Sequence, residues 1–345
     1  MIAAAPSFSR ILLVRTDRLG DLVLSTPAIA SFRRSWPHAR IEAVVSDYNE
    51  PVLRFNTDID ELHTLPRSAT RDEARSLMRR LGADVDLAVA LAPRTADYRL
   101  AAWTGAPQRL GYVYRRRYLS RVAAGVMLTA HAISEADPDL ADRFPDRPIA
   151  HEVHQVLSLV RLAGGEALTD SLVLDPGDEA RGFARALVPA GAVGLNLAPR
   201  WFENGFDADA VGALIQELAA ENADVLVTYG ADVATAAERV RASVASARVR
   251  WLVLAQPLHW IAALGQCAVV VTVDCGAVHV AAAQGVPVVA VYERRYYRLS
   301  SQEWSPWRVP SVVLCKPPAG ASSQPLLGDI VAGVRTLRSV PAPVS

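Results

Sequence analysis

Short runs of apolar residues alternate along this chain with stretches in which apolar residues recur at helical spacing. Such runs are typical of strands buried on both faces of a parallel sheet. Strands are predicted at residues 11–14, 41–45, 62–65, 87–91, 109–112, 193–197, 225–229, 249–254, 269–273 and 288–291. Because helices are expected between most of them, the pattern predicts an α/β protein with two doubly wound domains.

The alternation is interrupted near the middle of the chain, where Gly164 and Pro176 stand in a stretch without a clear period. We expect an N-terminal Rossmann-like domain over residues 1–170 and a second Rossmann-like domain over residues 171–325. Residues 326–345 are expected to form a C-terminal helix and tail that could pack back on the N-terminal domain.

Residues 269–291 read as a strand, a short turn, a helix of small residues and a second strand. The turn, Asp274-Cys275-Gly276-Ala277, follows the carboxyl end of a strand, where open α/β sheets bind ligands. Free backbone N–H groups at a helix start suit an anion, and His279 in the first turn could add a donor. The same pattern also fits a plain crossover in which Asp274 caps the helix and His279 lies on the surface.

Two other loops of the second half follow predicted strands. One carries Asn196 and Arg200, and the other is Thr228-Tyr229-Gly230-Ala231. A pyrophosphate on the Asp274 turn could take Arg200 as a mobile counter-charge. We therefore expect these residues on the side of the second domain that binds a phosphorylated ligand.

A polar stretch, residues 15–21, follows the first strand and is expected to be a loop. It carries Asp17 and Asp21, and a carboxylate in this place could take a proton from an acceptor hydroxyl. The alternative is that both aspartates merely solvate a tight turn.

Residues 112–121 read as a second exposed loop, rich in arginine and tyrosine, and residues 130–148 as an irregular one. Arg115, Arg116 and Arg117 could bind an anionic acceptor or lie near anionic lipid headgroups, or they could simply be a solvated surface.

Composition limits the partners. The 345 residues include 36 Lys and Arg and 36 Asp and Glu, and this balance argues against nucleic acid as a main partner. Three scattered cysteines fit a reducing compartment, so we expect a cytoplasmic protein that could touch the inner membrane from its cytoplasmic face. No group of potential ligands has metal-site spacing, so neither a metal nor a cofactor is expected.

Two motifs resemble glycosyltransferase family 9, the ADP-heptose:lipopolysaccharide heptosyltransferases. Residues 11–41, ILLVRTDRLGDLVLSTPAIASFRRSWPHARI, resemble the opening signature of that family. Residues 274–291, DCGAVHVAAAQGVPVVAV, are similar to its pattern D-[ST]-G-x-x-H-x-A-A-x-x-G-x-P. The resemblance implies a GT-B fold, in which two Rossmann-like domains face a central cleft and the second binds the sugar nucleotide.

The resemblance also implies an activity, the inverting transfer of heptose from ADP-heptose to a hydroxyl of a lipopolysaccharide core or other cell-surface glycan. The nucleotide sugar is then a substrate and not a cofactor. Asp21 matches the general base of the family, and Asp274, Gly276 and His279 match its pyrophosphate-binding residues. Acceptor contacts are expected from Asp17, Arg18, Gly20, Arg115, Arg116 and Arg117.

The chain departs from the family pattern at two places. Cys275 replaces a hydroxyl residue, and Asn204 stands where the family has a lysine against the phosphates, with Arg200 as a partial substitute. A catalytically weak or inactive sugar-nucleotide-binding protein, a family member using a different nucleotide sugar, and a sugar-nucleotide epimerase of the same fold are the alternatives.

Overall fold

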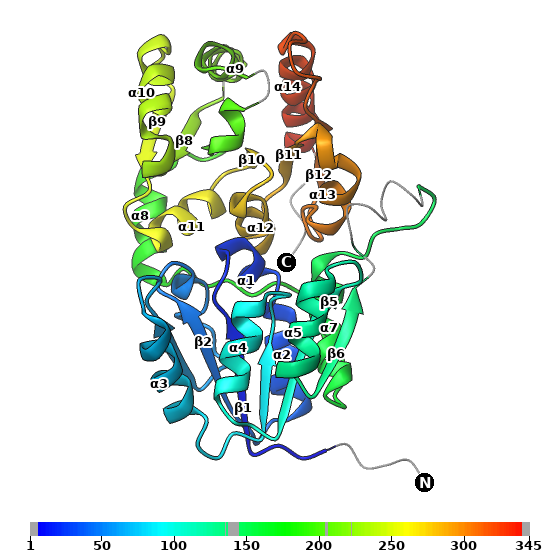
Figure 1. Ribbon diagram of the computed structural model, residues 1–345. Coiled ribbons are helices and arrows are strands. Elements are labelled where there is room, and N and C mark those ends of the chain that lie inside the picture. Colours follow the sequence, from blue (N-terminus) through cyan, green and yellow to red (C-terminus); the bar gives the residue numbers. More distant parts are fainter. Residues whose placement is uncertain (1–5, 135, 137–144, 204–205, 222, 340–345) are drawn as a thin grey trace. The chain divides into compact units, whose positions relative to one another are not determined.

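A computed structural model gives the fold of residues 6–134, 136, 145–203, 206–221 and 223–339 (Figure 1). The chain divides into two compact units, Met1–Asp175 and Pro176–Ser345. Asn204 lies outside the described residues, as do residues 340–345 of the expected tail.

The first unit is built on a six-stranded parallel sheet in the order β3-β2-β1-β4-β5-β6. Its strands are β1 (Arg10–Arg15), β2 (Arg40–Ser46), β3 (Glu61–Leu65), β4 (Leu87–Ala90), β5 (Gln108–Tyr114) and β6 (Ala130–Ser134). Its helices are α1 (Leu19–Val23), α2 (Thr26–Ser35), α3 (Arg71–Leu81), α4 (Thr95–Trp103), α5 (Tyr118–Met127) and α7 (Glu152–Leu162), with a short 3-10 helix η1 (Glu50–Val52). Because β1 pairs with β2 on one side and β4 on the other, the segment after β1 starts from the middle of the sheet.

Three elements of this unit differ from the sequence-based expectation. Residues 15–21 were expected to be a loop, but Leu19 begins α1, in which the apolar side chains of Leu19, Leu22 and Val23 recur at helical spacing and are buried. Residues 112–121 were also expected to be a loop, but β5 continues to Tyr114 and α5 begins at Tyr118. The stretch expected to be irregular from residue 130 opens with β6, which adds a parallel edge strand beside β5.

The second unit repeats the architecture with the strand order β12-β11-β10-β7-β8-β9. Its strands are β7 (Val193–Leu197), β8 (Val225–Tyr229), β9 (Val249–Val253), β10 (Val269–Val273), β11 (Val288–Tyr292) and β12 (Ser311–Cys315). Its helices are α8 (Asp178–Leu187), α9 (Ala208–Ala220), α10 (Ala234–Ser243), α11 (Pro257–Gly265), α12 (Gly276–Ala283), α13 (Tyr297–Glu303) and α14 (Gln324–Arg338), with 3-10 helices η2 (Pro199–Phe202), η3 (Ala231–Val233) and η4 (Arg294–Tyr296).

The core of the second unit is made largely of valine on the strands and leucine and alanine on the helices. β10 is buried along its whole length, as its unbroken valine-rich run predicts. The C-terminal helix α14 packs on β10, β11 and β12 and on α9, so it belongs to the core of this unit. Among the described residues, no helix is both long and apolar enough to cross a membrane.

Replacing two glycines of the second unit with alanine is expected to change the stability of the protein in opposite directions. Gly285, just after α12, has φ +73°, while Gly182 lies inside α8, and an added Cβ meets nothing within 4 Å at either site. Since neither site is crowded, only backbone preference differs. We expect Gly285→Ala to lower the free energy of unfolding by about 1 kcal/mol and Gly182→Ala to raise it by about 0.5–1 kcal/mol. Urea denaturation followed by circular dichroism measures both, and equal effects would contradict the assigned backbone conformations.

Candidate functional site

The centre of the first unit holds a buried guanidinium, that of Arg15 at the carboxyl end of β1, where only 1% of its side chain is exposed. Its Nε donates to Asp17 Oδ1 at 2.9 Å, and its Nη2 donates to Glu152 Oε1 at 2.9 Å. A third carboxylate, that of Asp21, lies 3.7 Å from Nη2. The single buried guanidinium of Arg15 therefore lies close to three carboxylates.

Arg15 also fixes the position of α1. Its Nη1 donates to Ser25 Oγ at 2.7 Å, and that hydroxyl donates to the backbone carbonyl of Asp21 at 2.9 Å. The Oε1 atom of Glu152, at the start of α7, accepts a second hydrogen bond from the hydroxyl of Tyr112 at 2.7 Å. These contacts link β1 and β5 to the starts of α1 and α7 around Asp21.

Arg15 does not stabilise the charges of the three carboxylates equally. At an effective dielectric constant near 20, the attraction between one cation and one carboxylate at close range is only ~4 kcal/mol. Burial alone would raise the pKa of Asp17, but the charge and hydrogen bond of Arg15 outweigh it and lower that pKa. Asp21 has the longest contact with Arg15. Burial, joined by the charges of Asp17 and Glu152, raises the pKa of Asp21 to about 8.

A fourth acidic residue, Asp97 at the start of α4, lies beside this cluster. Its Oδ1 accepts hydrogen bonds from the backbone N–H of Thr16 at 2.9 Å and from the Thr16 hydroxyl at 3.1 Å. Burial and the charge of Asp17 raise the pKa of Asp97 to about 6. Asp97 thus fixes the segment that leads from β1 to Asp17, and it adds negative potential that favours a proton on the cluster.

The structure places the other expected residues of this half at the same sheet edge. Arg18 is exposed at the N-cap of α1, and Gly20 is buried within that helix. Arg115, Arg116 and Arg117 directly follow β5, which is two strands away from β1 in the sheet. Their shared edge follows from the parallel arrangement of β1, β4 and β5.

In the second unit, Arg200 and Asp274 form an ion pair between η2 and the end of β10. Arg200 Nη1 also donates to the backbone carbonyl of Asp274 at 2.8 Å. The pair is only partly buried, with 37% of the Arg200 side chain and 16% of the Asp274 side chain exposed. An entering anion could therefore take up guanidinium donors that now bind Asp274.

Asn196 and Cys275 face inward at the strand ends. Asn196 Oδ1 accepts from the Thr228 hydroxyl at 2.9 Å, and its Nδ2 lies 3.5 Å from Thr272 Oγ1 and 3.6 Å from Cys275 Sγ. The Cys275 thiol also lies 3.3 Å from the Thr272 hydroxyl, and burial raises its pKa. These contacts make Asn196 and Cys275 a bridge across β7, β8 and β10 in which the sulfur stays a neutral thiol.

The remaining expected residues of this half surround the start of α12. Gly276 is the first helical residue after the N-cap Cys275, and Ala277 and His279 are buried in the following turn. Gly230 is further along the edge, directly after β8, where an added Cβ would meet Asp232 Oδ1 at 2.7 Å. The helix start therefore presents backbone amides at the strand end, as an anion site requires.

Lys316 is the only lysine in the sequence, and it lies at the carboxyl end of β12 with 1% of its side chain exposed. Its ammonium pairs with Glu293 Oε1 at 2.7 Å and donates to the backbone carbonyl of Glu203 at 2.8 Å. It also donates to the carbonyl of Arg200. A buried charge thus fastens the η2 segment, which carries Arg200, to the ends of β11 and β12.

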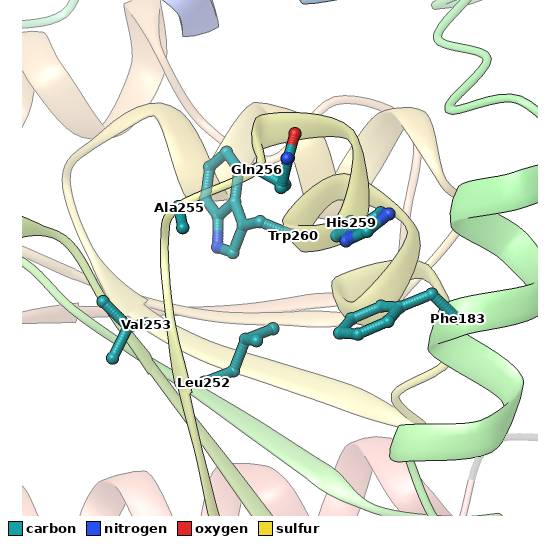
Figure 2. A pocket seen from close by; sticks show the side chains of 7 residues that line it. All are labelled: Phe183, Leu252, Val253, Ala255, Gln256, His259 and Trp260. Atoms are coloured by element: carbon teal, nitrogen blue, oxygen red, sulfur yellow. The ribbon is translucent and has the colours of Figure 1, made fainter.

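A small cavity opens at the carboxyl end of β9, between α8 and α11 (Figure 2). It measures about 140 Å³ and is lined by Phe183, Leu252, Val253, Ala255, Gln256, His259 and Trp260. The His259 ring stacks on Phe183, with centroids 4.2 Å apart and 12° between planes. Buried Trp260 Nε1 has no hydrogen-bond partner among the described residues, so the cavity combines flat apolar walls with a polar donor.

Glu42, Glu61 and His63 on β2 and β3 are close enough together to resemble a metal site. Glu42, however, accepts hydrogen bonds from Arg10 and Arg40 as well as contacting His63. Burial is outweighed by these contacts, and the pKa of Glu42 falls to about 2. Its charge is therefore already balanced by cations of the protein.

Several residues of both sites were not predicted from the sequence. Asp97, Glu152, Glu293 and the cavity residues act through contacts between distant parts of the chain, which no local pattern records. Lys316 did carry a signal, because a single lysine in an arginine-rich chain, directly after an apolar run, is unusual.

Comparison with known structures identifies the fold. The chain is similar to a glycosyl transferase family 9 protein from Veillonella parvula DSM 2008, with a TM-score of 0.77 and 19% identity over 97% of this chain and 99% of that one. It is similar to E. coli ADP-heptose lps heptosyltransferase II, with a TM-score of 0.71 and 18% identity over 95% and 99%. E. coli heptosyltransferase WaaC with ADP gives a TM-score of 0.69 and 16% identity over 96% and 100%.

These similarities and the two doubly wound parallel sheets show the GT-B fold, which confirms the predicted fold class. The family model of glycosyltransferase family 9 (heptosyltransferase) matches residues 151–323, half of the sequence. The chain belongs to glycosyltransferase family 9. No curated protein matches it.

The cluster around Arg15 predicts a pH-dependent effect of Asp21→Asn on stability. A carboxyl whose pKa rises from 3.8 to about 8 on folding keeps a proton that the unfolded chain releases, so wild-type stability falls between about pH 4 and pH 8. Asparagine does not titrate. We expect the stability of Asp21→Asn relative to wild type to rise over this range and then level off.

Urea denaturation at several pH values measures this difference, and Asp72→Asn, at an exposed position of α3, is the matched control. A relative stability that did not change with pH would show that Asp21 titrates normally.

The buried position of Lys316 predicts its reactivity. An amine-acylating reagent should reach the ammonium of Lys316 only after denaturation, which mass spectrometry of the peptides can measure. Because breaking a buried ion pair is costly, Lys316→Met should lower stability by about 3–5 kcal/mol, with part of the loss recovered when Glu293→Gln is added. Rapid native labelling of Lys316 would contradict its role as a fastening residue.

Proposed function

We propose that this protein is an inverting glycosyltransferase that moves a sugar, heptose from ADP-heptose, onto a hydroxyl of a lipopolysaccharide core or another cell-surface glycan. The observation that carries the proposal is Asp21, a largely buried carboxylate beside Arg15 with a pKa raised to about 8. The E. coli structures named for ADP-heptose and for ADP support the choice of donor.

In this proposal Asp21 is the general base. A carboxylate with a pKa near 8 is a stronger base than one near 4, and it is still partly ionised at neutral pH. Arg15 holds its backbone through Ser25 and remains beside it when the proton arrives. Asp17, Arg18 and Gly20, in the same segment, are proposed to contact the acceptor, together with Arg115, Arg116 and Arg117.

The second unit is proposed to hold the donor and to stabilise its departing diphosphate. Charge that develops on a leaving group is best stabilised by donors already in place. The start of α12 after Asp274 offers backbone amides, and Arg200 can turn from Asp274 to a phosphate oxygen. Arg200 would supply the positive charge that the family takes from a lysine, with Lys316 keeping its loop in place.

We assign the cavity at β9 to the ring of the nucleobase. It lies three strands from β10 in the sheet, roughly 14 Å at ordinary strand spacing, a span comparable with an extended nucleoside diphosphate. The stacked rings of Phe183 and His259 offer a flat surface, and the Trp260 N–H offers a donor. The volume suits one ring system rather than a whole nucleotide.

The second candidate is a protein that binds a sugar nucleotide but transfers it weakly or not at all. The ion pair of Arg200 with Asp274 favours this candidate, because a diphosphate must first break it. A different donor sugar is a third possibility within the same fold. In either case the acceptor is a glycan or glycolipid rather than nucleic acid, and peripheral contact with the cytoplasmic face of the inner membrane belongs to the proposal.

Asp21→Asn separates binding from transfer. We expect calorimetric affinity for ADP-heptose to stay within about twofold of wild type, while turnover with a lipopolysaccharide core acceptor falls by about 10²–10⁴-fold because the base is lost. Asp72→Asn should change neither.

Binding of ADP-heptose without any turnover of the wild-type protein would favour the silent binder. Unchanged turnover of Asp21→Asn would remove Asp21 from the mechanism.

A further inference from the structure

The helix α5 exposes apolar side chains that none of the described residues of the first unit covers. Leu119 is 88% exposed, Val126 77%, and Tyr118 and Val122 67% each. Every other large hydrophobic side chain among the described residues is less exposed than these four. Scattered apolar residues on a surface are ordinary, but four on one short helix indicate an interaction surface.

Helical geometry gathers these residues into one stripe. Leu119, Val122 and Val126 are at positions i, i+3 and i+7, so they share a face. Ala124 lies on the opposite face and is fully buried in the core beneath α4 and β5. The helix is therefore anchored by one side and presents the apolar side outward.

Positive charge borders the apolar stripe. Arg115, Arg116 and Arg117 lie just before the helix, and Arg121 lies within it. The Arg121 guanidinium donates to the carbonyl of Arg115 at 3.2 Å, which keeps these residues together. Because the whole chain has a formal net charge of zero, this cluster is a local feature rather than part of a general basic surface.

We propose that α5 is a membrane-docking helix that lies in the interface of an anionic lipid bilayer. An amphipathic helix with an exposed apolar face and a bordering arginine cluster has the chemistry of such a site, with apolar side chains at the acyl boundary and guanidinium groups at phosphate headgroups. A second copy of the chain fits less well, because pairing the same face of two copies would bring the arginines of both together.

The location also bears on the acceptor, a point that rests on the proposed function. The segment between β5 and α5 lies at the carboxyl edge of the first sheet, the edge that also carries Asp21. A helix docked on the bilayer would hold this edge near the headgroups. A glycolipid acceptor could then present its sugar to Asp21 while its acyl chains remain in the membrane.

The test is co-sedimentation of the full chain with vesicles of phosphatidylcholine, with and without phosphatidylglycerol. We expect binding that requires the anionic lipid. The triple variant Leu119→Gln, Val122→Gln and Val126→Gln should lower the partition coefficient by about tenfold or more, since three exposed apolar groups no longer enter the bilayer. Replacing Arg115, Arg116, Arg117 and Arg121 with Gln should abolish the preference for anionic vesicles.

Leu168→Gln, at another exposed apolar position of the same unit, is the matched control and should bind like wild type. Circular dichroism checks the fold of each variant, and turnover with a lipid-free acceptor should be unchanged in the triple variant. If neither the wild type nor any variant turned over the lipid-free acceptor, this result would count against the proposed function and not against membrane docking.

Absence of vesicle binding by the wild type, or equal binding by the triple variant, would overturn the docking proposal. A dimer in solution that the triple variant converts to monomer would overturn it in favour of a contact between copies.

Discussion

A single buried guanidinium organises the first unit of this protein. Arg15 ends the central strand and has three carboxylates around it, and the contacts bring together parts of the chain as distant as β1 and α7. A cation in a low-dielectric interior must be compensated, yet it cannot fully compensate three acids at once. The pKa of Asp21, which has the longest contact, is raised to about 8, whereas the pKa of Asp17 is lowered, so the packing of a core decides how readily each acid binds a proton.

The second unit uses buried charge for a different purpose. Lys316 holds backbone carbonyls of the η2 segment, and the Arg200 side chain from that segment reaches Asp274 at the end of β10. Here the buried cation fixes a loop, and a partly exposed cation on that loop remains able to change partners. Rigid support for one mobile charge is what a site for a departing diphosphate requires.

The strands were predictable because a parallel sheet buries both faces and leaves continuous apolar runs in the sequence. The runs at Val193, Val225 and Val269 each correspond to an observed strand. The helices α1 and α5 were not predicted, because each is short and stands beside polar or arginine-rich residues typical of loops. In α5 most of the large apolar side chains face outward, so the usual rule that an apolar stripe faces the core does not hold for this helix.

The sites could be located from the sequence but not completed from it. Strand ends followed by Asp21 and by the Asp274 turn indicated the carboxyl edge of each sheet as the place of a site, and the roles of these residues stay predictions. Local sequence could not show that Asn196 and Cys275 turn inward toward Thr272, or that Glu152 reaches Arg15 from far along the chain. Which side chains meet in such contacts depends on the register of the strands and on which helix covers the sheet at that point.

The near-absence of lysine has a consequence for the surface charge of the protein. With one lysine and 35 arginines among its 36 basic residues, almost all of its positive charge resides on groups that stay protonated above pH 12. Lysine ammonium groups would lose their protons near about pH 10, where a carboxyl with a pKa of about 8 is almost wholly ionised. Alkaline conditions that ionise Asp21 therefore leave the positive charge of the arginine side chains intact.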